Sequence, residues 1–392
     1  MSKFIKLFKW LYVACVYWLH YSHNRDNSLW VFGCWGGNKF SDNAKYLFQY
    51  VKERHPEIRS VWITQNRQVK ESLLRRGYEV YLANTSSAQT ILKKAGVAFY
   101  TNSLNDFGSN PFLCGAKLCA LFHGVGFKNE LRELDNQETL KAKLKMLKHR
   151  IYDLSYTDYI FTTSEFIKEK FYKQQYNAAR EHIILTGQPR NDIFFEDNGC
   201  RNCNKMILYM PTFREDEVGR KKLEYIINQI ANSYAFNDLL CRYGYQLVVK
   251  PHYLTRVTRR RVLSNISIMN DKDVSDIQQL LVKVDILITD YSSVIGDYVL
   301  LNRPIVFFPY DIDLYKKFKP MANEYDIILG KTSVFTLDTL YSLLENLFKE
   351  QVDFQSVNEF INYYLNSPNL RNGGYCKNIC DYMFNNLKIM KE

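Results

Sequence analysis

The chain has 392 residues, of which 46% are hydrophobic and 15% aromatic, and it contains no low-complexity tract or internal repeat. This composition excludes a disordered or fibrous protein and is sufficient for two domains of ordinary size. The formal net charge of +11 favours polyanionic partners, but it does not choose among nucleic acid, anionic lipid and phosphorylated substrates, and a merely solubilising surface also explains it.

The nine cysteines are odd in number and lack the spacing of a disulfide framework. The apolar start of the chain has no convincing small-residue cleavage site, so reduced thiols in a cytosolic protein are the simplest expectation. Cys200 and Cys203 form a lone CxxC pair with no second pair nearby, which is too little for a zinc site.

The first 25 residues combine lysines with aromatic side chains. Lys3, Lys6 and Lys9 precede an uncharged run over residues 10–19, which is shorter than the ~20 residues of a bilayer-spanning helix. Trp and Tyr beside Lys suit the headgroup region of an anionic membrane. Residues 1–25 are therefore predicted to form an amphipathic helix that contacts the membrane; the alternative is a helix packed on the body of the protein.

From residue 28 onward, short apolar runs alternate with longer amphipathic stretches. The predicted strands of the first half cover residues 29–33, 60–64, 79–82, 97–101, 117–122, 159–163 and 183–186. The predicted helices cover residues 43–54, 69–76 and 86–95, a charged excursion at 130–149, and a stretch that begins at Ser164. Strands separated by helices of this length predict a parallel sheet with helices on both faces.

A polar stretch over residues 197–204 indicates an interdomain linker, after which the alternation restarts. The further predicted strands cover residues 205–210, 245–250, 285–289 and 304–308, and the further helices 223–234, 276–282, 294–301 and the end of the chain. We therefore predict an α/β protein with two Rossmann-like lobes, at residues 26–198 and 199–350, and C-terminal helices at 351–392 that cross back to the first lobe. Tandem lobes of this kind bind ligands outside the carboxyl ends of their strands, here in a central cleft.

The most informative motif lies where an apolar strand meets a helix. The strand ends in Thr289 and Asp290, Ser292 and Ser293 follow, and the helix begins. Free N–H groups and the positive partial charge of a helix start, together with serine hydroxyls, favour a diphosphate group. Asp297, on the same helix face as Ser293, is placed to accept a hydrogen bond from a donor hydroxyl. Plain N-capping by either serine is the alternative.

A histidine follows a strand in the first half of the chain. His123 is followed by Gly124 and Gly126, which permit close approach of the backbone to a ligand. An imidazole at the carboxyl end of a strand can take a proton from an attacking hydroxyl group. A purely structural histidine is the alternative.

A second histidine follows a strand in the second half. His252 comes directly after Pro251, and the basic run Arg256, Arg259, Arg260 and Arg261 follows. His252 with Arg256 is suited to face a phosphate group. A solvated basic helix explains most of residues 259–261.

The sequence carries no strong metal or P-loop signature. Asp311-Ile312-Asp313 is a lone DxD in a predicted turn, and neither a GxxxxGK[ST] nor an HExxH motif is present. We therefore predict no resident cofactor and leave a divalent metal ion open.

Taken in order, these motifs resemble the CDP-glycerol glycerophosphotransferase family, whose members prime and polymerise teichoic acids and related polyol-phosphate chains. The resemblance covers most of the chain after residue 28. The similar segments, with the family patterns in brackets, are residues 41–45 (SDNPK, with Ala44 for Pro), 122–128 (HGTPLK), 187–192 (GYPRND), 209–213 (YAPTW) and 289–298 (TDYSSVFFDY, with Ile295-Gly296 for the paired aromatics). His252 is followed by Tyr253, where the family usually has Pro.

The resemblance implies a GT-B-like pair of lobes, with the acceptor side in the first and the donor nucleotide in the second. His123 falls on the proposed catalytic base of the family, and His252 is the second catalytic candidate. The candidate donor-binding residues are Arg214, Arg256, Thr289, Asp290, Ser292, Ser293 and Asp297. The candidates for an acceptor-side or structural role are Gly124, Lys128, Arg190 and Asp192.

The implied donor is CDP-glycerol or CDP-ribitol, and the implied acceptor is a polyprenyl-diphosphate-linked sugar or a growing polyol-phosphate chain. The acceptor hydroxyl would attack the β-phosphorus and release CMP, on a peripheral protein at the cytoplasmic face of the membrane. Anionic substrates and an anionic membrane agree with the basic charge, and no nucleic-acid partner is expected.

Two other functions stay open at this stage: a GT-B glycosyltransferase that uses a sugar nucleotide, and a non-catalytic protein that binds membranes or polyanions. The polyol, the acceptor, the distinction between primase and polymerase, and the oligomeric state are also open.

Overall fold

The structure is a computed structural model. It describes residues 24–108, 111–128, 157–175, 180–196, 205–252, 254–255, 257–258, 262–270, 273–274, 276–319 and 321–387. The predictions for the membrane-contact helix (apart from residues 24 and 25), the excursion at 130–149, the linker at 197–204, Arg256 and residues 259–261 lie outside these ranges. None of the helices within these ranges combines the length and hydrophobicity needed to cross a membrane.

The described residues divide into two compact units. The first contains residues 24–123, 157–192 and 372–387, and the second contains residues 124–128 and 193–371.

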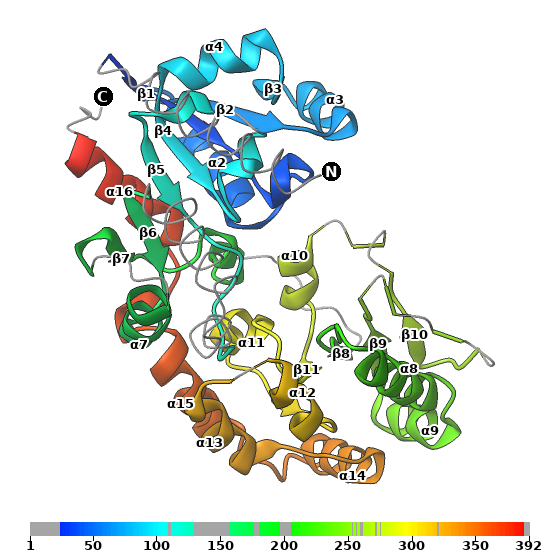
Figure 1. The fold of residues 1–392 in the computed structure, drawn as a ribbon. Helices are drawn as coiled ribbons and strands as arrows, with labels where there is room; N and C mark the ends of the chain where they lie inside the picture. Colours follow the sequence, from blue (N-terminus) through cyan, green and yellow to red (C-terminus); the bar gives the residue numbers. More distant parts are fainter. Residues whose placement is uncertain are drawn as a thin grey trace. The chain divides into compact units, whose positions relative to one another are not determined.

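A seven-stranded parallel sheet, in the order β3-β2-β1-β4-β5-β6-β7, forms the centre of the first unit (Figure 1). Its strands are β1 (Asp26–Phe32), β2 (Arg59–Thr64), β3 (Val80–Leu82), β4 (Ala95–Tyr100), β5 (Lys117–Ala120), β6 (Tyr159–Thr162) and β7 (Ile183–Leu185). Its helices are α2 (Asp42–Arg54), α3 (Arg67–Arg75), α4 (Ser86–Lys94), α7 (Glu165–Ile167) with the π-helical turns Lys168–Gln175, and α16 (Tyr375–Leu387).

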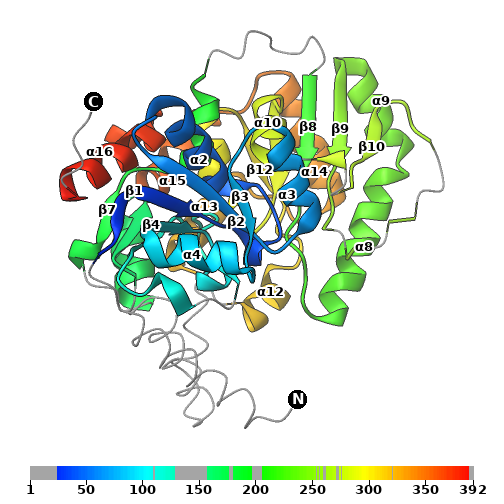
Figure 2. The ribbon, with the colours of Figure 1, turned by 90° about the horizontal axis from the view of Figure 1, so that it is seen from above.

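Helices cover both faces of this sheet because its inner strands are apolar on both sides; β4 is buried along its whole length. In Figure 2, α4 lies on one face, and α2 lies on the other. On the α2 face, Trp62 packs against Phe48 of α2 at 5.5 Å between ring centroids, and Trp30 packs against Phe384 of α16 at 5.8 Å. The last helix of the chain thus completes the core of the first unit.

The second unit contains a five-stranded parallel sheet in the order β10-β9-β8-β11-β12. Its strands are β8 (Lys205–Tyr209), β9 (Tyr245–Val249), β10 (Ile266–Ile268), β11 (Ile286–Thr289) and β12 (Ile305–Phe307). Its helices are α8 (Glu217–Ala231), α9 (Tyr234–Tyr243), α10 (Ile277–Val282), α11 (Val294–Tyr298) continued by the 3-10 turn Val299–Leu301, α12 (Ile312–Phe318), α13 (Asn323–Thr332), α14 (Leu337–Phe348) and α15 (Gln355–Leu365). One apolar core joins the sheet to α8, α9 and α14.

The predicted α/β class with parallel strands is confirmed. The helix predicted over residues 223–234 is corrected: it begins earlier, at Glu217, because the Asp216 side chain accepts a hydrogen bond from Gly219 N at 2.6 Å and caps it. Ser233 caps the separate helix α9, which the sequence pattern did not predict. The short strand β10 was not predicted from the sequence. Asp311 lies in the predicted turn, in which Ile312 N donates to Pro309 O at 3.1 Å, and α12 follows directly.

Candidate active site

The candidate donor turn lies where the strand order of the second unit reverses. From β8 the sheet extends through β9 to β10 on one side, and through β11 to β12 on the other. The loops that follow β8 and β11 therefore diverge at this point, and in open parallel sheets this is where ligands bind. The turn from Thr289 to Ser293 follows β11, and Arg214 lies in the loop that follows β8.

Arg214 is the centre of a buried ion cluster at this point. Its guanidinium donates to both carboxylate oxygens of Asp311, at 2.7 and 2.8 Å, and to Asp290 Oδ2 at 2.9 Å. It also donates to the carbonyl oxygen of Thr212. Arg214 and the two aspartates have side-chain exposures of about 1%. The cluster therefore joins the loops that follow β8, β11 and β12.

Further donors compensate the charges of both carboxylates. Tyr291 donates its hydroxyl to Asp311 Oδ1 at 2.9 Å, and the backbone N–H groups of Thr212 and Tyr291 donate to Asp290 Oδ1 at 2.9 and 2.6 Å. Hydrogen bonds of this kind are what a buried charge needs in order to be tolerated.

The cluster shifts the pKa of its members. Burial opposes the charge on Arg214, but Asp290 and Asp311 outweigh it and raise the pKa of the guanidinium above its usual value. Burial, with Asp311 and Asp290 adding to it, raises the pKa of the Tyr291 phenol. Arg214 is thus held as a cation and Tyr291 as a neutral donor. The predicted donor-side residues Arg214 and Asp290 have most of their polar atoms engaged within the protein.

The other residues of the turn differ in exposure. Thr289 is buried, and its hydroxyl donates to the carbonyl of Met210 at 2.8 Å. Asp297 is also buried and accepts a hydrogen bond from Gln278 Nε2 at 3.2 Å. Ser292 and Ser293 are half-buried.

The two serines also differ in their bonds. Ser292 Oγ accepts a hydrogen bond from Val294 N at 3.4 Å, whereas Ser293 begins α11 without a side-chain capping bond. Plain N-capping therefore does not account for Ser293.

Gly296, which departs from the family pattern, has a steric reason within the second unit. A Cβ at Gly296 would lie 2.9 Å from the carbonyl oxygen of Val125, so no larger side chain fits there. A Cβ at Gly126 would lie 3.3 Å from the Cα of Ser293, which is a tight contact. The segment that begins at Gly124 thus packs against the start of α11.

His252 lies in the loop that follows β9. Its ring lies 4.6 Å from the ring of Phe213, and its Nδ1 accepts a hydrogen bond from Leu254 N at 3.4 Å. Its carbonyl oxygen accepts from Thr255 N at 2.8 Å. The structure thus brings His252 beside the loop that carries Arg214.

In the first unit, His123 follows β5 and is exposed. The preceding Phe122 has a φ of 51°, which is rare for a residue with a Cβ. Asn43 fixes this conformation, since its side-chain amide donates to the carbonyl oxygens of Leu121 and Phe122 at 3.3 and 2.9 Å. The backbone that carries the imidazole is therefore held from α2.

Arg190 holds His123 from another side. One guanidinium nitrogen of Arg190 donates to the carbonyl oxygen of His123 at 2.9 Å and to Asp42 Oδ1 at 2.7 Å. The backbone N–H of Arg190 donates to Asn43 Oδ1 at 3.1 Å. Three segments predicted from the sequence, residues 41–45, 122–128 and 187–192, thus meet around His123.

Asp192 and Lys128 make other contacts. The Asp192 carboxylate accepts the N–H groups of Tyr375 and Cys376, at 2.7 and 2.8 Å, and so caps the start of α16. Burial raises the pKa of Asp192, although these hydrogen bonds oppose the effect. Lys128 forms an antiparallel bridge with Met321 in the second unit. An acceptor contact for Arg190, Asp192, Gly124 or Lys128 stays a prediction.

The chain matches the model of the CDP-Glycerol:Poly(glycerophosphate) glycerophosphotransferase family over residues 15–385. It belongs to this family.

Two relatives differ in how much of their length the chain covers. The teichoic acid poly(glycerol phosphate) polymerase of Staphylococcus epidermidis is 28% identical over 314 residues, which are 73% of this chain but 41% of the polymerase. The teichoic acid glycerol-phosphate transferase of Staphylococcus aureus is 25% identical over 385 residues, which are 92% of this chain and 93% of the transferase. The chain therefore spans less than half the length of the first relative.

Among solved structures, one of the wall teichoic acid polymerase TagF has a TM-score of 0.75 at 23% identity and covers 99% of both chains. At this sequence identity, the structural similarity is evidence of the fold alone. It confirms the predicted GT-B-like fold class.

The DxD at residues 311–313 does not form a metal site with the described residues. Asp311 is engaged by Arg214 and Tyr291, and the ranges that the structure covers contain no group of three His, Cys, Asp or Glu suited to a metal ion. The DxD pattern suggests Asp311 as a metal ligand. It does not predict the ion pair of Asp311 with Arg214, because the pattern gives no sign of a distant arginine.

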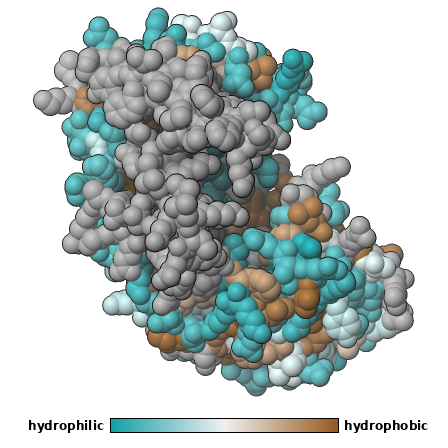
Figure 3. Space-filling view, viewed as in Figure 1, coloured by the Kyte–Doolittle hydropathy of each residue, from teal (hydrophilic) through white to brown (hydrophobic). Residues whose placement is uncertain are grey.

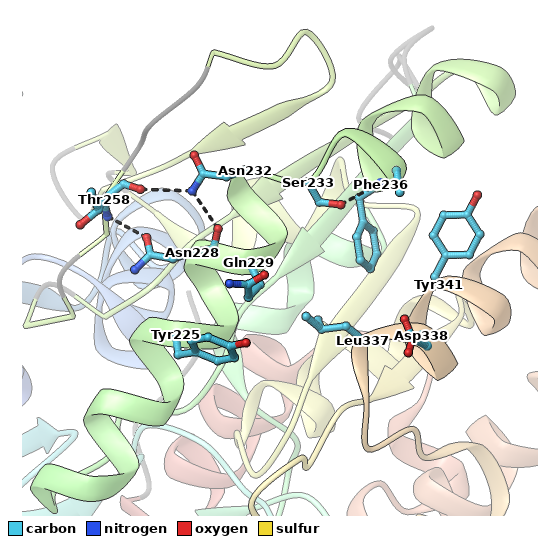
Figure 4. A pocket seen from close by; sticks show the side chains of 11 residues that line it. Tyr225, Asn228, Gln229, Asn232, Ser233, Phe236, Thr258, Leu337, Asp338 and Tyr341 are labelled. Carbon is cyan, nitrogen blue, oxygen red and sulfur yellow. Dashed lines mark hydrogen bonds between the residues drawn. The ribbon is translucent and has the colours of Figure 1, made fainter.

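A cavity of about 730 Å³ lies elsewhere in the second unit (Figure 4). Its lining comes mainly from α8, α9 and α14, and includes Tyr225, Phe236 and Tyr341. Asn228 and Asn232 bond to Thr258 at its edge, so part of its polar lining holds a loop. None of the predicted site residues lines it, and we do not assign the donor to it.

Three residues beside His123 were not predicted as site residues from the sequence: Trp35, Asp42 and Asn43. Asp42 and Asn43 belong to the segment 41–45 that carried the family resemblance, which was the signal that could have found them. The signal for Trp35 is the Trp-Gly-Gly run that begins three residues after the end of β1.

Proposed function

We propose that this protein transfers a polyol phosphate, either glycerol phosphate or ribitol phosphate, from a CDP-polyol to an acceptor hydroxyl and releases CMP. The acceptor is a polyprenyl-diphosphate-linked sugar or a growing polyol-phosphate chain. The reaction takes place at the cytoplasmic face of the membrane, with the protein bound peripherally. The observation that carries the proposal is the family match over residues 15–385.

The donor role of the second unit is supported by the position and chemistry of its turn. Ser292 and Ser293 are the half-buried residues of a turn whose other polar groups are buried, and they lie where the sheet order reverses. Their hydroxyls and the adjacent backbone N–H groups are donors suited to phosphate oxygens. The Arg214 cluster holds this turn in place and has little capacity left for a ligand.

In the proposed reaction, His123 accepts the proton of the acceptor hydroxyl as its oxygen bonds to the β-phosphorus of the donor. The bond from this phosphorus to the bridging oxygen breaks, and CMP leaves with that oxygen. Phosphoryl transfer needs positioning and charge neutralisation more than covalent work by the protein. His252 and the two serines are the residues we assign to this neutralisation.

A donor screen tests the proposal. The purified protein is incubated with a synthetic lipid-linked acceptor and with CDP-glycerol, CDP-ribitol or UDP-sugars, and products are analysed by mass spectrometry. The expected result is CMP release and a mass increase of one or more polyol phosphates from one CDP-polyol. The number of units added distinguishes a primase from a polymerase.

UDP release with transfer of a sugar would overturn the proposal in favour of a glycosyltransferase. Salt-sensitive binding of the acceptor without turnover of any donor would point to a non-catalytic polyanion-binding protein.

A further inference from the structure

Trp35 is an unusual residue at the surface of the first unit. Large hydrophobic side chains are exposed at scattered positions of the described surface, such as Val262 and Tyr363, and Figure 3 shows apolar residues interspersed with hydrophilic ones. The exposure of a hydrophobic side chain therefore does not by itself indicate a functional site. Trp35 differs because its backbone has a φ of 49°, in the left-handed region that residues with a Cβ rarely adopt.

The surrounding residues maintain this conformation. Gly36 and Gly37, at φ of 60° and 73°, continue the left-handed turn. The buried carboxylate of Asp106 accepts a hydrogen bond from Gly36 N at 2.6 Å, and Thr64 donates its hydroxyl to Gly37 O at 2.7 Å. Strained backbone that its surroundings hold in place is characteristic of functional sites.

The side chain of Trp35 contacts His123. The two ring centroids are 5.4 Å apart, with an angle of 52° between the ring planes. The indole Nε1–H donates to Asp42 Oδ2 at 3.1 Å, which fixes the direction of the ring. The ammonium group of Lys39 lies over the same indole, 5.1 Å from its centroid.

Asp42 therefore reaches His123 by two routes. Through Oδ1 it binds Arg190, which holds the carbonyl oxygen of His123, and through Oδ2 it binds Trp35, which contacts the imidazole. Asp42 is itself held at a φ of 64°. One carboxylate thus orients both the main chain and the ring side of the same histidine.

We propose that Trp35 is a positioning residue for His123, and that Asp42 locks it in place. This inference rests on the proposed function, in which the imidazole must face the acceptor hydroxyl. The indole restricts the rotation of the imidazole, so the reactive nitrogen is presented in one direction. A general base that is free to rotate is correctly placed for a smaller fraction of the time.

Kinetics of Trp35 variants with the CDP-polyol and the synthetic lipid-linked acceptor test the proposal. In Trp35→Ala, kcat should fall about ten- to a hundredfold while the KM for the donor stays unchanged, as expected for misplacement of a catalytic group. Trp35→Phe keeps a ring beside His123 but lacks the indole N–H that binds Asp42, so it should recover only part of this loss. Tyr363→Ala, which truncates an exposed aromatic residue in the second unit, is the matched control and should behave like the unmodified protein.

A double-mutant cycle isolates the hydrogen bond from Trp35 to Asp42. Asp42→Asn keeps a residue type that tolerates positive φ, so the backbone is preserved. Trp35→Phe and Asp42→Asn disrupt the same bond, so their combined loss in kcat should be smaller than the product of the single losses. Strictly multiplicative losses would contradict a shared role.

NMR of protein with 13C-labelled histidines detects the contact between Trp35 and His123 in the absence of substrate. The His123 signal is assigned by its disappearance in His123→Gln, and ring-current effects of the indole should displace it in the unmodified protein. In Trp35→Ala the signal should move to the range of solvent-exposed histidines.

An unmoved signal together with a kcat within twofold of the unmodified protein would overturn the inference. A moved signal in a protein that turns over no CDP-polyol would instead support the contact and refute the proposed function.

Discussion

The candidate residues of the two units are held in place by different physical means. In the second unit, Arg214, Asp290 and Asp311 form a buried ion cluster with side-chain exposures of about 1%. In the first unit, His123 is exposed and Trp35 is 38% exposed, and strained backbone and the ion pair of Asp42 with Arg190 orient them from below the surface.

Because of this difference, substitutions in one unit should mainly affect the stability of the fold, and substitutions in the other should mainly affect activity. A buried charge that loses its partner costs a large part of the folding free energy, because no water can replace the partner. A surface group that loses its partner leaves the fold intact but loses its direction. Substitutions in the second-unit cluster should therefore destabilise the fold, and substitutions of the exposed residues His123 and Trp35 should lower turnover.

The largest effect on stability is expected for Arg214→Met. It leaves Asp290 and Asp311 buried without their cation and should lower the free energy of unfolding by about 3–5 kcal/mol. Urea unfolding followed by circular dichroism measures the change. The control is Arg242→Met, which removes an exposed ion pair with Glu345 (3.6 Å) and should cost at most ~1 kcal/mol. Equal losses in the two variants would show that the buried cluster has no special role.

The largest effect on turnover with little effect on stability is expected for His123→Ala. Loss of the proposed general base should lower kcat by about 10²- to 10⁴-fold, while the free energy of unfolding changes by less than ~0.5 kcal/mol. The matched control is His182→Ala, which truncates another exposed histidine of the first unit. Full activity of His123→Ala would remove this residue from the mechanism.

A smaller effect, on donor binding alone, is expected for Ser293→Ala. The lost hydrogen bond to a charged phosphate oxygen should raise the KM for the CDP-polyol by about tenfold. Stability should hardly change, because Ser293 makes no side-chain capping bond at the start of α11. Ser342→Ala, on the exposed face of α14, controls for loss of a serine hydroxyl in the same unit. An unchanged donor KM would count against the proposed phosphate site.

In both regions, local features could be predicted from the sequence and distant pairings could not. Strands such as β1 and β11, and the positions of His123 and Ser293 after strands, follow from local apolar patterns and could be predicted. The pairing of Arg214 with Asp311 joins residues 97 positions apart, and a DxD motif suggested a metal instead. Pairings of this kind depend on tertiary contacts, which local periodicity does not encode.

The smallest effect concerns a tyrosine in the core beside the Arg214 cluster. The hydroxyl of Tyr209 is buried and has no hydrogen-bond partner among the described residues. Burial raises the pKa of Tyr209 well above its usual value, Tyr310 and Asp290 add to this effect, and Arg214 opposes it. The folded protein therefore keeps a proton that the unfolded chain loses as the pH rises, so this tyrosine lowers stability above about pH 10.

Tyr209→Phe should remove that pH dependence. At pH 7 the free energy of unfolding should be unchanged or higher by up to ~1 kcal/mol, because an unpaired buried hydroxyl is lost. Between pH 7 and pH 10 the unmodified protein should lose about 0.4 kcal/mol more than the variant, since half of the unfolded-state phenol is ionised at pH 10. Urea unfolding at both pH values measures this difference, and Tyr363→Phe at an exposed position controls for the substitution. Parallel pH profiles of the two proteins would show that water or another partner already reaches the Tyr209 hydroxyl, and that this edge of the cluster is less isolated from solvent than the buried ion pairs require.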